Sequence, residues 1–202
     1  VEYRVGMMGF IDFSAVPGGE EFTESGNLGL LDQICALKWI QKNISAFGGD
    51  PNNVTVFGES AGAGSVSLLP LISEADGLFR RVIAESGSVA LTYSRGECQK
   101  LTALLLEKSG CKTMDELMAL SEDTLIELND ELSDYNNFPE RDGILLPVDL
   151  YGAYGQGNAA PVDMLIGTNA DEVRYWIREM GYYQKGISGM SIYKHGFPIM
   201  YE

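Results

Sequence analysis

Apolar side chains recur at steps of three and four positions between residues 30 and 44, and this spacing predicts an amphipathic helix. The apolar face consists of Leu30, Ile34, Leu37, Ile40 and Ile44. The residues that follow, Phe47-Gly48-Gly49, are typical of a helix end because glycine readily takes the left-handed conformation of a C-cap. Cys35 lies among these apolar residues, so we expect it to be a small core residue.

Short runs of β-branched and aromatic residues predict the strands. We expect a strand in residues 1–13 that runs into a loop, and further strands at 54–57, 79–87 and 164–167. Because strands alternate with helices, the pattern predicts a parallel α/β sheet. Functional sites in such sheets lie at the carboxyl ends of the strands.

A block of helices is predicted between residues 95 and 132. A first helix stops at Gly110, and Thr113 and Glu116 form a capping box that opens a second. A third helix is striped by Leu125, Leu128 and Leu132. We interpret residues 95–140 as a helical insertion within a single domain that spans residues 1–202.

The run Gly58-Glu59-Ser60-Ala61-Gly62 fits the pattern G-x-S-x-G. It follows a predicted strand and precedes a predicted helix, which is the context of a nucleophile elbow, a sharp strand-to-helix turn that exposes a serine. We expect side chains in place of the two glycines to collide with the neighbouring strand and helix. The helix N-terminus would favour an oxyanion next to Ser60. The alternative is an ordinary glycine turn.

A formal net charge of −15 argues against nucleic acid and anionic membranes as partners, although solubility alone explains such a charge. The sequence contains no apolar run long enough for a transmembrane helix, and its first residues do not resemble a signal peptide. Cys35, Cys98 and Cys111 cannot all pair, and their spacing matches no zinc site. We therefore expect a reducing compartment and no metal or other cofactor.

Together these motifs resemble the type-B carboxylesterase and cholinesterase family of α/β-hydrolases. The resemblance implies an α/β-hydrolase fold, with part of the parallel sheet, helices on both faces and a helical insertion. The segments that carry it are Tyr3-Arg4-Val5-Gly6 with Gly9-Phe10, Gly26-Asn27-Leu28-Gly29-Leu30-Leu31-Asp32-Gln33, residues 47–62, Asp142-Gly143 with Leu146-Pro147, and Ile166-Gly167-Thr168-Asn169 with Asp171-Glu172.

The resemblance implies roles for individual residues. Ser60 would be the nucleophile, Glu172 the acid of the triad, and the Ala61 N–H one donor of the oxyanion hole. Asp171 is chemically capable of the acid's role, but the family motif places the acid second in the Asp-Glu pair. Ser86 matches a family position close behind the triad, and it could equally be a serine that caps a strand end.

Parts of the family pattern are missing. No His-Gly-Gly-Gly oxyanion loop is present, and Val173 stands where the family usually has glycine. The catalytic histidine of the family normally lies far beyond the acid and is followed by a carboxylate. The single histidine, His195, comes soon after Glu172, and Pro198 stands at the carboxylate position. We interpret residues 173–202 as the start of a cap segment, and the chain as the middle of a longer esterase.

The function implied is hydrolysis of a small-molecule carboxylic ester through an acyl-serine intermediate, with a histidine from outside this chain as the base. No second cysteine follows Cys111 to close the disulfide of secreted relatives, so a bacterial-type, cytoplasmic enzyme is expected. The alternative is an inactive adhesion or scaffold protein of the neuroligin type. Those relatives typically lose the elbow serine, whereas Ser60 is intact. The particular ester and the oligomeric state stay open.

Overall fold

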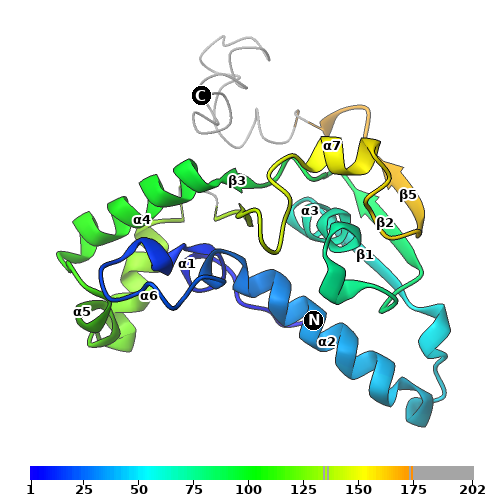
Figure 1. Ribbon diagram of the computed structural model, residues 1–202, viewed down its shortest axis with the longest axis horizontal. Coiled ribbons are helices and arrows are strands. Elements are labelled where there is room, and N and C mark those ends of the chain that lie inside the picture. Colours follow the sequence, from blue (N-terminus) through cyan, green and yellow to red (C-terminus); the bar gives the residue numbers. More distant parts are fainter. Residues whose placement is uncertain (134, 136, 173, 175–202) are drawn as a thin grey trace.

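The computed structural model describes residues 1–133, 135, 137–172 and 174 (Figure 1). Val173, His195 and Pro198, and with them nearly all of the predicted cap segment, lie outside the described residues.

The scaffold of the site is a parallel sheet of three strands in the order β1-β2-β5. Its strands are β1 (Thr55–Glu59), β2 (Arg81–Glu85) and β5 (Asp163–Gly167). In the register, Glu59 stands opposite Glu85, and Glu85 stands opposite Gly167. The three strands therefore end together, and the residues that follow them meet at one edge of the sheet. The predicted parallel α/β architecture is confirmed.

Helices α2 (Leu28–Asn43), α3 (Ala61–Leu68) and α7 (Leu150–Gly155) share one apolar core with the sheet. Helix α3 packs directly against β1 and β2. The sequence pattern did not indicate α7, which is short and begins at Asp149, whose carboxylate accepts a hydrogen bond from the Gly152 N–H. Short 3-10 turns join these elements at Ser25–Asn27, Ile44–Phe47, Pro51–Asn53, Leu69–Leu71 and Ser73–Ala75.

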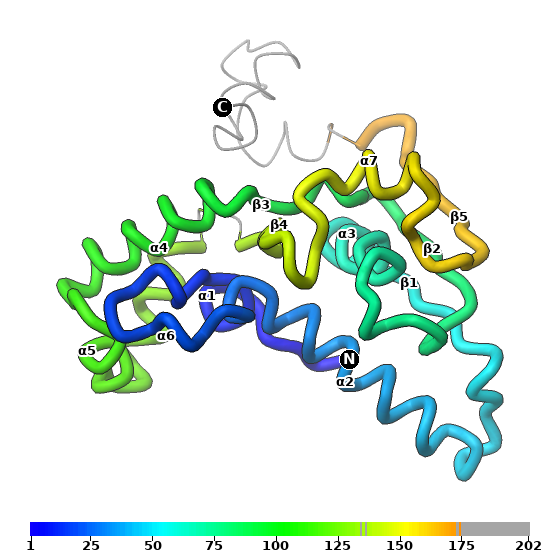
Figure 2. Tube along the Cα trace, viewed as in Figure 1, coloured from blue at the N-terminus to red at the C-terminus, as the bar shows by residue number. Residues whose placement is uncertain are grey.

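The predicted helical block consists of α4 (Arg95–Ser109), α5 (Met114–Met118) and α6 (Glu122–Glu131). Gly110 takes the left-handed conformation at the end of α4, and the capping box of Thr113 and Glu116 is formed. A two-stranded ribbon of β3 (Tyr93–Ser94) and β4 (Glu140–Arg141) joins the block to the sheet region. The block has its own apolar core, which also takes in the N-terminal segment that lies beside it (Figure 2).

The prediction of a strand in residues 1–13 is wrong. The segment contains a short helix, α1 (Met7–Phe10), and a 3-10 turn at Phe13–Ala15. Its backbone N–H groups bond to side chains or within the segment instead of to a neighbouring strand: Met7 donates to Asn129, Phe13 to Ser25, and Gly9 and Phe10 to the Gly6 carbonyl. Because a strand is stabilised by its partner strand, the local sequence pattern alone is not enough to predict whether residues 1–13 form a strand.

The prediction that Cys35 belongs to the core is also wrong, because its side chain is exposed. The buried face of α2 includes Leu30, Ile34 and Leu37. Cys35 follows Ile34 and therefore points about 100° further round the helix.

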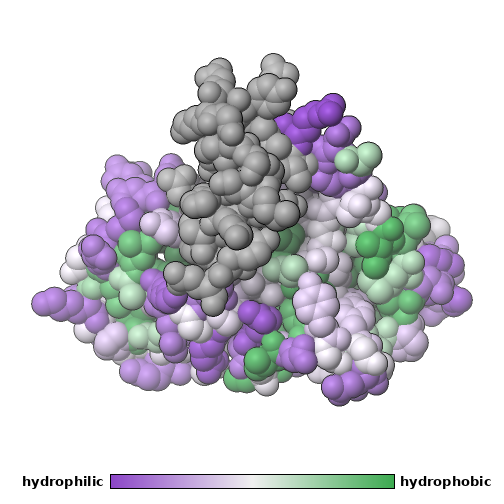
Figure 3. All heavy atoms as spheres, turned by 90° about the horizontal axis from the view of Figure 1, so that it is seen from above, coloured by the Kyte–Doolittle hydropathy of each residue, from purple (hydrophilic) through white to green (hydrophobic). Residues whose placement is uncertain are grey.

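Parts of the sheet are uncovered in the described chain. Phe57 of β1 is 73% exposed, and Leu165 and Ile166 of β5 are 65% and 63% exposed. A hydrophobic area appears on the right of Figure 3, the side on which Figure 1 places β5. Large exposed apolar areas of this kind mark surfaces that associate with other polypeptide.

Candidate active site

Ser60 lies in the turn between β1 and α3, in the position that the elbow prediction requires. Its backbone has φ 55° and ψ −115°, a conformation that is rare outside glycine. The Ser60 N–H donates to the carbonyl of Glu85 (2.9 Å), and the Ser60 carbonyl accepts from the Gly64 N–H (2.9 Å). These bonds fix the turn to the end of β2 on one side and to α3 on the other, and so hold the unusual conformation in place.

The hydroxyl of Ser60 is not used to cap the helix. Ser60 is the N-cap residue of α3, yet its side chain makes no capping hydrogen bond. Ser94, the N-cap of α4, shows the ordinary arrangement, in which the hydroxyl accepts from the Glu97 N–H. Ala61 is the first residue of α3, so its N–H belongs to the helix N-terminus, where such groups lack intrahelical partners.

Close backbone approach explains two glycines around Ser60. A Cβ atom on Gly58 would overlap the backbone of Gly62, and one on Gly87 would overlap the Ser60 carbonyl oxygen. A Cβ atom on Gly62 would meet nothing within 4 Å. The prediction that a side chain would collide with its surroundings is therefore confirmed at Gly58 and wrong at Gly62. Gly87 lies outside the G-x-S-x-G pattern. Glycine is required there because the segment that follows β2 passes close to the backbone of the elbow.

Glu172 lies in the turn that follows β5. Its Oε1 accepts hydrogen bonds from the Ser86 hydroxyl and from the Asn169 N–H (2.7 Å). These bonds stabilise the charged carboxylate and so hold the pKa of Glu172 below its ordinary value. The bond from Ser86 makes the larger contribution. Asp171 instead forms an exposed ion pair with Arg174 (3.4 Å). The hydrogen bonds to its carboxylate make Glu172 a better candidate than Asp171 for the acid of a triad.

Ser86 connects the two candidate residues. It follows β2, the central strand, and is the other non-glycine residue with positive φ (56°) among those described. Its N–H donates to the carbonyl of Gly167 (2.8 Å), so the end of β2 is bonded to the end of β5. The elbow is bonded to Glu85, immediately before Ser86. Of the two interpretations left open for Ser86, the geometry favours a position beside the acid.

The described residues contain no candidate base, since His195 falls outside them. Across the described part of the chain, no group of three or more His, Cys, Asp and Glu side chains is placed to hold a metal ion. No described helix has the length and apolar character needed to cross a membrane. Cys98 and Cys111 are buried thiols, and burial raises the pKa of Cys98.

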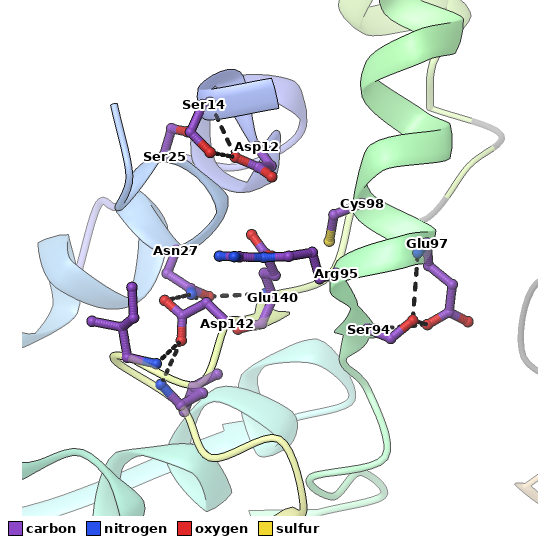
Figure 4. Close-up of polar contacts among 12 residues, drawn as sticks. Asp12, Ser14, Ser25, Asn27, Ser94, Arg95, Glu97, Cys98, Glu140 and Asp142 are labelled. Atoms are coloured by element: carbon purple, nitrogen blue, oxygen red, sulfur yellow. Dashed lines mark hydrogen bonds and ion pairs between the residues drawn. The ribbon is translucent and has the colours of Figure 1, made fainter. Parts of the chain in front are cut away.

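A second polar cluster lies where the N-terminal segment meets α4 and β4 (Figure 4). The Glu140 side chain, 1% exposed, pairs with Arg95 (2.9 Å). The Asn27 side chain donates to the Glu140 carbonyl (2.9 Å) and to Asp142 (3.2 Å). Burial raises the pKa of Glu140. No local sequence pattern indicates this cluster, because its members come from distant segments.

Comparison with known proteins agrees with this geometry. The family model described as the carboxylesterase family matches residues 1–191. The chain is 40% identical over 184 residues to the para-nitrobenzyl esterase of Bacillus subtilis (strain 168), a match that covers 85% of this chain and 36% of that protein. It is 36% identical over 198 residues to neuroligin-3 of Mus musculus, covering 94% of this chain and 23% of that protein.

Among solved structures, a carboxylesterase of Geobacillus stearothermophilus at pH 6.8 superimposes with a TM-score of 0.85 and 36% identity. That match covers 94% of this chain and 41% of the other. A structure described as a thermophilic PNB esterase gives a TM-score of 0.75 at 37% identity, covering 87% of this chain and 37% of the other. The chain thus spans less than half the length of these relatives. It belongs to the carboxylesterase family and has the α/β-hydrolase fold.

Proposed function

We propose that the complete protein containing this chain hydrolyses small-molecule carboxylic esters through an acyl-serine intermediate on Ser60. The observation that carries the proposal is the conformation of Ser60, whose strained backbone places at the N-terminus of α3 a hydroxyl that makes no capping hydrogen bond. Strained backbone of this kind is retained where function requires it. Family membership supports the same reaction class.

In the proposed first step, the Ser60 Oγ attacks the ester carbonyl carbon while a base removes the hydroxyl proton. The carbonyl oxygen becomes an oxyanion, and the Ala61 N–H donates to it. When the tetrahedral intermediate collapses, the C–O bond to the alcohol breaks and the base returns the proton to the departing oxygen. Water then attacks the acyl-serine in the same manner and releases the acid.

Glu172 acts in this scheme on the base and not on the ester. A buried or hydrogen-bonded carboxylate orients the histidine of a triad and stabilises its charged form. The bonds from Ser86 and Asn169 keep Glu172 ionised and fix the side chain for that task. The histidine itself comes from outside the described residues.

The second candidate function is adhesion, because the relatives include neuroligins at 36% identity. A protein of that kind has no need of a reactive serine. The two functions therefore differ in what they predict for Ser60.

A fluorophosphonate probe on the complete protein, followed by peptide mass spectrometry, tests the assignment. We expect the label on Ser60, and its loss in Ser60→Ala. Ser67→Ala removes a hydroxyl from the same helix, α3, and should keep the label. Labelling at Ser65, Ser67 or Ser86, or no labelling of a folded protein, would overturn the proposal.

A further inference from the structure

A cavity of about 340 Å³ lies between the β3–β4 ribbon and the start of α7. Val89, Ala90 and Leu150 form part of its wall, together with Tyr93 and Tyr151. Val89 and Ala90 belong to the segment that leaves β2 through Ser86, so the cavity begins close to the carboxyl edge of the sheet. Its volume suits a small organic ligand.

Arg141 also lines this cavity, and its guanidinium has few close hydrogen-bond partners. Neighbouring residues of a strand point to opposite faces. Glu140 enters the buried polar cluster, and Arg141 accordingly faces the other side. Its contacts are long: one nitrogen lies 3.4 Å from the Val148 carbonyl and another 3.8 Å from the Glu97 carboxylate. Its Nε is buried and has no hydrogen-bond partner within the described residues.

Other arginines of this chain have guanidinium groups with short hydrogen bonds to a carboxylate. Arg4 makes two hydrogen bonds to Asp32, at 2.7 and 2.8 Å. Arg95 bonds to Glu140 at 2.9 Å. Buried donors are rarely left unpaired, and a guanidinium can present parallel N–H groups to a carboxylate. The guanidinium of Arg141, by contrast, has only long contacts at its terminal nitrogens and no partner at Nε among the described residues.

The two carboxylates of the cavity wall give the guanidinium no short hydrogen bond: Glu97 forms only the long 3.8 Å ion pair with it, and both carboxylates cap helices. Glu97 accepts from the N–H and the hydroxyl of Ser94, at 2.6 Å each, and Asp149 accepts from the Gly152 N–H (2.8 Å). Each carboxylate lies at a helix N-terminus, where the helix dipole offsets its charge. Burial, with smaller contributions from neighbouring charges, raises the pKa of Tyr93 to about 12, so its phenol stays protonated and able to donate.

We propose that this cavity binds a carboxylate of the substrate through Arg141, and that the enzyme therefore prefers monoesters of dicarboxylic acids. This inference rests on the proposed esterase function. The ester group would lie toward Ser60, and the second carboxylate would occupy the cavity and accept hydrogen bonds from the two terminal nitrogens of the guanidinium, whose present contacts are long. Lysine cannot reproduce a bidentate contact, so arginine is the appropriate residue.

The test compares monoethyl succinate with ethyl butanoate, two esters of the same ethanol with and without a free carboxylate. We expect the complete protein to have the higher kcat/KM on monoethyl succinate. Arg141→Met should lower the ratio of the two kcat/KM values by about tenfold to hundredfold, the range expected for a lost hydrogen-bonded charge pair, mainly through KM. Arg141→Lys should give an intermediate ratio.

Arg80→Met is the matched control. It removes an exposed arginine next to β2 at the amino end of the sheet, away from the cavity, and should leave the ratio unchanged. A thermal unfolding curve for each variant shows that it is folded. If the ratio in Arg141→Met equals that of the unsubstituted protein, or if monoethyl succinate is the poorer substrate, the proposal is wrong.

Binding of succinate to Ser60→Ala, measured by isothermal titration calorimetry, separates this proposal from the proposed function. Binding that weakens at least about tenfold on adding Arg141→Met supports the carboxylate site even if no ester is hydrolysed. Conversely, ester hydrolysis that depends on Ser60, without any succinate binding, supports the esterase and overturns the carboxylate site.

Discussion

The Ser86 hydroxyl donates a hydrogen bond to the carboxylate of Glu172, and this contact joins residues that are far apart in the sequence. Each residue follows a different strand of the sheet, Ser86 after β2 and Glu172 after β5. The contact therefore depends on the pairing of the strands, and it places a neutral donor beside the carboxylate that we assign to the triad. Five predictions follow from this contact, from the other contacts of the candidate site and from the buried pair of Arg95 and Glu140.

Glu172→Gln should lower kcat of the complete enzyme by up to about 10⁴-fold, the loss seen when the acid of a triad is made neutral. The amide keeps the size of the side chain and removes the charge that stabilises the histidine. Steady-state kinetics on an ethyl ester measure the effect. Asp171→Asn is the control, because Asp171 forms an exposed ion pair with Arg174, and it should have little effect. The opposite ranking would assign the acid to Asp171.

Ser86→Ala should make activity more sensitive to acid. The Ser86 bond lowers the pKa of Glu172, so the carboxylate stays charged to a lower pH than an ordinary glutamate. Without the bond its pKa rises, and protonation at falling pH sets in earlier. The acidic limb of the kcat/KM profile should move to higher pH. Ser88→Ala, a neighbouring hydroxyl, should leave the profile in place, and an unshifted Ser86→Ala profile would contradict the role of the bond.

Gly87→Ala should destabilise the protein, whereas Gly62→Ala should not. The new Cβ at position 87 overlaps the Ser60 carbonyl oxygen, and overpacking of this kind destabilises proteins by about 1–3 kcal/mol. Gly62 lies within α3 with open space around its Cβ position, so alanine there should be neutral or stabilise by up to about 1 kcal/mol. Denaturant unfolding monitored by circular dichroism compares them. A larger loss at position 62 than at 87 would show that the pattern glycine is the constrained one.

Glu140→Gln should remove a pH dependence of stability. Burial raises the pKa of Glu140, so the folded state binds this proton more tightly than the unfolded state. The resulting stabilisation is present at pH values below the ordinary glutamate pKa and is lost as pH rises through the raised value. Tm measured across this acidic range should fall less with rising pH in Glu140→Gln than in the unsubstituted protein. An identical slope in both would mean that Glu140 does not titrate differently on folding.

Arg95→Met is the companion variant for the same pair. It leaves the Glu140 carboxylate buried without its cation, which should destabilise the protein by about 1–3 kcal/mol at neutral pH. The loss should shrink on acidification, since protonated Glu140 no longer needs the guanidinium. A loss that is constant with pH would indicate that Arg95 acts through packing alone.

Features with a local physical cause could be predicted from the sequence. The apolar period of α2, the capping box at Thr113 and the glycine turn around Ser60 each arise from residues close together in the chain, and the structure contains all three. The prediction of a strand in residues 1–13 was wrong because a strand needs a partner strand, whereas here Met7 and Phe13 donate to the side chains of Asn129 and Ser25.

Other features of the structure could not be predicted because they arise from contacts between distant segments. The pairing of Arg95 with Glu140, and the approach of Gly87 to Ser60, depend on how β4 and β2 are placed by the fold. Nothing in the residues around either position indicates its partner. The Ser60 motif can be recognised in the sequence because its turn is formed by neighbouring residues. The hydrogen bond from Ser86 to Glu172 cannot, because it depends on the pairing of β2 with β5.

The register of β5 against β2 has a consequence for how folding can be followed. A shift of one residue would turn the side chains of β5 to the opposite face and move the turn that carries Glu172 away from Ser86. A misregistered sheet could retain ordinary helix and strand content in its circular dichroism and still separate the acid from the elbow. Under the proposed function, covalent labelling of Ser60 is thus a stricter measure of native structure in this protein than any spectrum of its secondary structure.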